Sequence, residues 1–162
     1  MKPKDEEPDM IAHRLTDNEI RIRIAPAHLR WPRADTSMVW RSLHDCVQQL
    51  HGFARTIDED CLQIEQTREL GRDEIERHRT EVGQQALKKL AAFRPFQIAK
   101  QAASKEIETL QKRDDLTFQE AQGKQRLMMA LDELRGGIAA MERLLLERCK
   151  MSERPARRPV YY

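Results

Sequence analysis

The chain contains few of the residues that characterise compact, disulfide-bonded or membrane-embedded proteins. Among its 162 residues, aromatic side chains make up 5%, and there are 6 glycines and 7 prolines. Its three cysteines include no C-x-x-C pair, so they offer no disulfide framework and fit a reducing compartment. No apolar stretch approaches the ~18–20 uninterrupted residues that a membrane span needs. These absences argue against a disulfide scaffold and against a membrane-spanning protein.

Charge is abundant but nearly balanced. Charged residues form 35% of the chain, yet the formal net charge is only +2, which is too small to indicate nucleic-acid binding by the whole chain. Residues 1–8 carry charge where a secretory signal would have its apolar core. This composition is typical of long exposed helices. We therefore expect a cytoplasmic, helical protein.

Proline positions divide the chain into segments. Because proline lacks an amide N–H and clashes with the preceding helical turn, long helices can run only between the prolines at 32, 95 and 155. We predict an all-α fold with two long helical arms, about 36–93 and 96–150, which fold back at Pro95 as an antiparallel coiled-coil hairpin. The predicted organisation is an extended N-terminal arm over 1–34, a helical hairpin domain over 35–151, and a basic, disordered tail over 152–162.

Both arms carry apolar residues at helical spacing. The first arm repeats every seven residues, and the second alternates spacings of four and three. A reversal at Pro95 would set Leu43 against Leu146 and Leu50 against Ala139. The residues predicted to form the helix seam are Leu43, Leu50, Ile57, Ile64, Leu127, Leu131, Leu134, Ile138, Met141 and Leu145.

Two weak points favour an alternative, a bundle of four shorter helices. Gly71, followed by Asp73 and Glu76, is typical of a helix stop and a new start. The matching break in the second arm ends at Thr117, which forms a capping-box pattern with Glu120. The first arm itself should begin at one of the possible N-caps over 35–37.

The segment before the first arm has its own pattern. Residues 19–24, Glu-Ile-Arg-Ile-Arg-Ile, alternate as a half-buried strand does. They would either lie extended on the helices or join the sheet edge of a partner. Trp31, in a basic aromatic segment, would clamp this arm or anchor a partner. The possible partner-binding residues are Ile20, Ile22, Ile24, Arg30, Trp31 and Arg33.

No residue pattern indicates catalysis or metal binding. None of the five histidines follows a glutamate by three residues, as the metal sites of helical bundles require. Cys61 falls on the predicted seam, where a buried thiol is inert. The run Asp58-Glu59-Asp60 is expected to form a solvated face. We therefore predict no enzyme activity, no catalytic, cofactor-binding or metal site, and no cofactor.

The expected function is that of a non-enzymatic coiled-coil assembly or adaptor protein, with protein partners or self-association. In length, hairpin form and charge, residues 36–150 resemble the short coiled-coil hairpin proteins that serve as central stalks of flagellar and type III export ATPases. That resemblance implies a stalk-like role in a secretion or flagellar export complex, although the N-terminal arm departs from those proteins. A further alternative is a nucleic-acid-associated regulator that uses the basic segments 21–33 and 154–158.

Overall fold

The computed structural model describes residues 11–24, 26 and 28–151, and within them all regular structure is helical. A short helix, α2 (Asp17–Ile24), and a single 3-10 turn, η1 (His28–Arg30), precede the main body. Four longer helices follow: α3 (Met38–Glu65), α4 (Arg72–Ala91), α5 (Arg94–Gln111) and α6 (Phe118–Arg148). The all-helical class predicted from the sequence is therefore confirmed for this part of the chain. The predicted basic tail, 152–162, lies outside the described residues.

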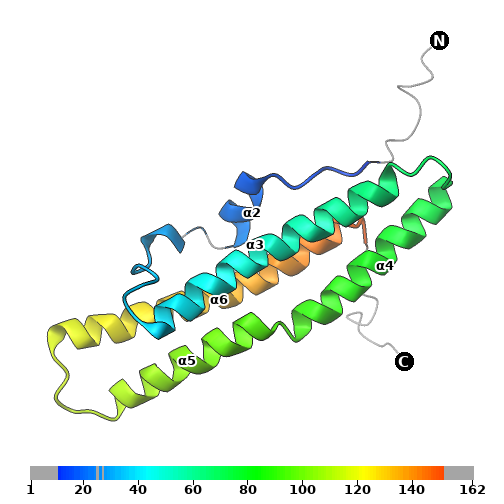
Figure 1. The fold of residues 1–162 in the computed structure, drawn as a ribbon. Helices are drawn as coiled ribbons and strands as arrows, with labels where there is room; N and C mark the ends of the chain where they lie inside the picture. The colour runs from blue at the N-terminus through cyan, green and yellow to red at the C-terminus, as the bar shows by residue number, and fades with distance from the viewer. Residues whose placement is uncertain (1–10, 25, 27, 152–162) are drawn as a thin grey trace, which may run out of the picture.

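The four longer helices form three neighbouring rods: α3, α4 together with α5, and α6 (Figure 1). The chain runs along α3, reverses at 66–71, returns along α4 and then α5, reverses at 112–117 and runs along α6. Helices α4 and α5 follow each other in one line, separated by a short break before Arg94. Helix α3 packs against α4, α5 and α6. The architecture is thus closer to the bundle alternative than to a two-armed hairpin.

Pro95 does not reverse the chain, and the predicted hairpin pivot is wrong. Helix α5 begins at Arg94, so Pro95 lies in its first turn, where the missing N–H would have no partner within the helix. A proline there marks a helix start without requiring a change of direction. The reversals occur instead at the two weak points. Gly71 N–H is bonded to the Glu74 carboxylate, and Thr117 forms its capping box with Glu120.

Because the chain reverses twice, α3 and α6 run in the same direction. The predicted antiparallel pairing of the two arms, with Leu43 against Leu146, is therefore wrong. Cys61 near the end of α3 contacts Cys149 at the end of α6, and Trp40 near the start of α3 lies close to Leu127 in the first third of α6. The predicted seam residues nevertheless lie inside the protein. Ile64 and Ile138 are partly buried, and the others are buried: Leu43, Leu50, Ile57, Leu127, Leu131, Leu134, Met141 and Leu145.

The alternating segment 19–24 forms a helix, so the strand prediction is also wrong. Thr16 accepts a hydrogen bond from Glu19 N–H, and the Glu19 carboxylate accepts one from Thr16 N–H, which makes a capping box at the start of α2. Ile20 and Ile24 are four residues apart, so they share one helical face as readily as one strand face. Both are 1% exposed, whereas Ile22 is 55% exposed. Helix α2 packs that face onto α3 and α6 (Figure 1).

Candidate functional site

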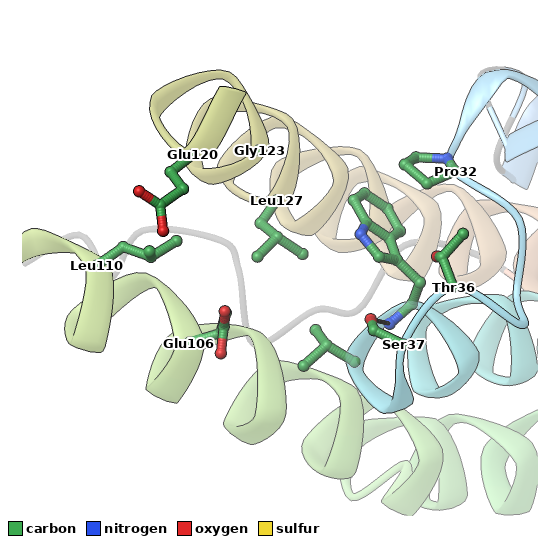
Figure 2. Close-up of a pocket in the computed structure, with 10 residues that line it drawn as sticks. Pro32, Thr36, Ser37, Glu106, Leu110, Glu120, Gly123 and Leu127 are labelled. Atoms are coloured by element: carbon green, nitrogen blue, oxygen red, sulfur yellow. Dashed lines mark hydrogen bonds between the residues drawn. The ribbon is translucent and has the colours of Figure 1, made fainter. Parts of the chain in front are cut away.

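The candidate site is a pocket of about 420 Å³ where α3 begins, α5 ends and α6 begins (Figure 2). The segment before α3 closes one side of it. Its apolar surface comes mainly from Val39, Trp40, Leu110 and Leu127. The remaining lining residues are Pro32, Thr36, Ser37, Glu106, Glu120 and Gly123.

The pocket exists because the three rods differ in length at this end. Trp40, near the start of α3, shares the pocket with Glu106 and Leu110 of α5 and with Leu127 of α6. Both α5 and α6 continue past that level to their turn at 112–117, and α3 does not (Figure 1). We call this projecting part of the α5–α6 pair, residues 106–127, the tip. In the rest of the bundle, α3 covers the apolar groove between the other two rods. At the tip, α5 and α6 leave this groove open.

Apolar side chains are accessible on the helix ends that form the pocket. Phe118 at the start of α6 is 76% exposed, and Met38 at the start of α3 is 72% exposed. Ile107 and Leu110 on α5 are only partly buried. Large apolar side chains that gather on one region of a surface are typical of an interaction site.

The groove has acidic residues along its edges. Glu106 is exposed on α5, and Glu120 projects from the first turn of α6 (Figure 2). Arg113 holds Glu120 through two contacts of 2.8 and 3.3 Å, and its hydrogen bond is the main reason that the pKa of Glu120 is lowered. Glu120 is therefore ionised at neutral pH, and the groove presents carboxylates beside apolar surface.

An aromatic cluster fixes the segment that closes the pocket. Trp31 lies 6.1 Å from Trp40 and 5.6 Å from His44 between ring centroids, and its indole N–H donates to Glu133 of α6 at 2.7 Å. The His44 Nε2 atom lies 2.6 Å from the carbonyl oxygen of Pro32, which can only accept, so this nitrogen carries a proton. These contacts attach residues 28–37 to both α3 and α6.

The residues proposed from the sequence as partner contacts have separate positions. Ile20 and Ile24 are buried under α2, and Trp31 is half-buried in the aromatic cluster. Ile22, Arg30 and Arg33 are exposed. Sequence reasoning missed Leu29, which is 74% exposed, and it missed the groove, because no local pattern tells which helix stops short.

A second feature, at the opposite end of the bundle, is a buried cluster of charges. Arg148 of α6 binds the Asp58 carboxylate at 2.6 Å and both oxygens of Glu65 at 2.8 Å. Arg79 binds Glu65 at 2.9 Å, and Arg14 binds Asp58 at 2.7 Å. All of these side chains except that of Arg14 are at most 6% exposed. The cluster joins α3, α4, α6 and the N-terminal segment.

The prediction that Asp58-Glu59-Asp60 forms a solvated face is wrong for its first residue. Glu59 and Asp60 are exposed as expected, but Asp58 is 3% exposed. The signal that was available is spacing: Asp58, Cys61 and Glu65 lie three and four residues apart, on one helical face. Charged residues on such a face require buried partners of opposite charge.

The arginines keep both carboxylates ionised. Burial by itself raises the pKa of Asp58 and Glu65. Hydrogen bonds from Arg14 and Arg148 to Asp58, and from Arg148 and Arg79 to Glu65, outweigh the burial and leave both pKa values lowered. The contacts of the cluster join three arginines to two carboxylates.

Acidification should therefore destabilise the fold. The ordinary pKa values of Asp58 and Glu65 are 3.8 and 4.5, and the folded values lie below them. In acid, the unfolded chain therefore binds more protons than the folded protein. The stability that the two carboxylates contribute is complete above their unfolded-state pKa values, and it is lost as the pH falls through their folded-state pKa values. Urea unfolding should show a lower midpoint at pH 3 than at pH 7. Glu59→Gln, at the exposed neighbour, should leave this difference unchanged, and a midpoint equal at both pH values would contradict the assignment.

Among the described residues, no group of three or more His, Cys, Asp or Glu side chains is arranged to hold a metal ion. No helix in the same part of the chain combines the length and apolarity needed to cross a bilayer. Comparison with known proteins gives no match to a protein family, to a curated protein or to a solved structure.

Proposed function

We propose that this protein is a non-enzymatic adaptor that binds an amphipathic helix of a partner protein in the groove at the tip. The observation that carries the proposal is the position of the start of α3, beyond which α5 and α6 continue to their turn at 112–117 without the third rod. A helix that lies in this groove would continue the line of α3. It would cover the apolar floor as α3 covers the rest of the core.

The acidic residues define the chemistry of the partner. Glu106 is exposed beside the apolar floor, whereas Glu120 is already paired with Arg113, so the bound helix would carry an apolar stripe with lysine or arginine facing Glu106. The role as an export-ATPase stalk is not proposed, because it rested on a two-armed hairpin.

A peptide-binding experiment tests the proposal. The probe is a labelled synthetic helix of about 14 residues, with leucines at i, i+3, i+4 and i+7 and lysines beside them. Its affinity for the full chain is measured by fluorescence anisotropy. A control peptide keeps the leucines and replaces each lysine by glutamate. We expect the lysine peptide to bind more tightly, with a preference that weakens in high salt.

Gly123→Leu should block the groove without harming the fold. A Cβ atom at Gly123 meets no heavy atom within 4 Å, and leucine favours a helix more than glycine does. The leucine side chain would occupy the pocket and weaken peptide binding roughly tenfold or more. Gly136→Leu is the matched control, because its Cβ also meets open space on the same helix but outside the pocket.

Charge-reversal variants give a second test with the same peptides. Glu106→Lys should weaken the lysine peptide by roughly threefold to tenfold, and Glu108→Lys, exposed on the same helix but outside the pocket, should not. Equal binding of both peptides, or full binding by Gly123→Leu, would reject the groove. Light scattering shows whether the protein is a dimer. If the wild type is a dimer and Gly123→Leu is a monomer, a second copy of the chain occupies the groove, and the proposal of a partner helix is rejected.

A further inference from the structure

Two of the three cysteines lie together at the end of the bundle. Cys61 on α3 and Cys149, the residue that follows α6, have their Sγ atoms 3.5 Å apart. A disulfide bond is about 2.05 Å long, so closure needs a movement of roughly 1.5 Å. Cys46 is buried farther along α3, about 22 Å from Cys61 at 1.5 Å per residue. Cys46 therefore serves as a control thiol that should not take part in a disulfide with Cys61 or Cys149.

The neighbouring cluster makes the paired thiols unequal. Arg148 precedes Cys149 in the sequence, and Arg79 belongs to the same cluster. The hydrogen bond between the two thiols lowers the pKa of Cys149. Burial opposes this shift, and the charges of Arg148 and Arg79 act in the same direction as the hydrogen bond. The same hydrogen bond and burial raise the pKa of Cys61. Burial raises the pKa of Cys46 to about 12, with a smaller contribution from Asp45.

Cys149 is 1% exposed, so a peroxide reaches it only when the end of α6 opens locally. Cys149 caps the last turn of α6, and the next residue, Lys150, has a positive φ of 54° where the helix stops. Helix ends open more readily than helix centres, and such opening admits a small oxidant. Cys61 lies inside α3 and is fixed by comparison. Closure therefore requires displacement of one helix end and not of the bundle.

We propose that Cys61 and Cys149 form a reversible intramolecular disulfide when the protein meets a peroxide. The Cys149 thiolate attacks one peroxide oxygen, so an S–O bond forms, the O–O bond breaks, and hydroxide leaves and takes up a proton as water. Cys61 then gives up its proton and attacks the sulfenic sulfur. The S–S bond forms, the S–O bond breaks, and the oxygen leaves as a second water. The two sulfurs lose two electrons, and the peroxide gains them.

The disulfide would bind the end of α6 to α3. It joins residues 88 positions apart, so it closes a long loop in the unfolded chain. A cross-link of this kind raises the thermal midpoint, on the order of 5–10 °C for a chain of this size. Oxidation would thus stiffen the end of the bundle opposite the groove.

The test counts thiols in the full-length protein. The reduced protein is treated with hydrogen peroxide under native conditions, then unfolded in N-ethylmaleimide and weighed by mass spectrometry. The wild type should take up one maleimide after oxidation and three before it. Cys46→Ala should take up none after oxidation, and dithiothreitol should restore two. Peptide mapping should find Cys61 linked to Cys149.

Single variants separate the roles of the pair. Cys61→Ala and Cys149→Ala should lose the disulfide and the rise in the thermal midpoint, and Cys46→Ala should retain both. Three maleimides on the oxidised wild type would overturn the proposal, as would a disulfide to Cys46 or one between two chains. Mapping of the wild type decides the linkage even where a variant fails to fold.

Discussion

Replacing Arg148 by methionine should lower the free energy of unfolding by about 3–5 kcal/mol. The methionine side chain occupies a similar volume but leaves the Asp58 and Glu65 carboxylates buried without their shared arginine. Arg14 and Arg79 would each still contact one carboxylate, but the link between α6 and α3 would be lost. Urea unfolding followed by circular dichroism measures the change. Arg143→Met, at an exposed position of the same helix, should change stability by less than about 0.5 kcal/mol.

The pH dependence of this variant distinguishes a lost ion pair from lost packing. Loss of Arg148 removes one of the hydrogen bonds that lower the pKa of Asp58 and of Glu65, so both pKa values should rise and protonation should become easier as the pH falls. The wild type, in contrast, loses stability in acid because its carboxylates have lowered pKa values. The difference in stability between the two proteins should therefore shrink from pH 7 to pH 4. A constant difference would indicate that Arg148 acts through packing alone.

The second large effect is expected at Gly137, where α2 crosses α6. A Cβ atom at this position would lie 2.5 Å from the carbonyl oxygen of Ile24, which is backbone and cannot rotate away. Gly137→Ala should therefore displace α2 and lower the free energy of unfolding by about 1–3 kcal/mol. Gly136→Ala is the matched control. Its Cβ meets open space, so the better helix propensity of alanine should stabilise the protein by up to about 1 kcal/mol.

Limited proteolysis with trypsin tests whether Gly137→Ala displaces α2. Arg21 and Arg23 lie in α2, and Arg23 is attached to Glu147 of α6 by contacts of 2.8 and 2.9 Å. If Gly137→Ala displaces α2, cleavage after these arginines should accelerate relative to the wild type and to Gly136→Ala. Equal cleavage rates in all three proteins would show that α2 tolerates the added methyl group.

Local features of the fold could be predicted from the sequence. Ser37 caps α3 and Thr117 caps α6, because each cap requires only a side-chain oxygen and a nearby backbone N–H. Membership of the core was predictable for the same reason, since helical spacing decides which face is apolar. The periodicity of α2 was ambiguous, because Ile20 and Ile24 fit both helix and strand.

The direction of each rod and both sites depend on distant contacts. Pro95 is compatible with a reversal and with a straight continuation, so it could not decide between a hairpin and three rods. Asp58 resembles Glu59 in sequence, and its contacts with Arg14 and Arg148, which are far away in the chain, set it apart. The groove arises from the relative lengths of rods that are far apart in sequence. No residue in it has a local signature.

The parallel course of α3 and α6 has an electrostatic consequence. At the tip, the amino termini of α3 and α6, with their partial positive charge, lie near the carboxyl terminus of α5. At the opposite end of the bundle, the carboxyl termini of α3 and α6, with their partial negative charge, lie near the amino terminus of α4. The dipoles therefore favour the carboxylates of the groove at one end and the arginines of the buried cluster at the other. A helix that entered the groove with its carboxyl end toward Ser37 would extend the dipole of α3, whereas the reverse orientation would oppose it.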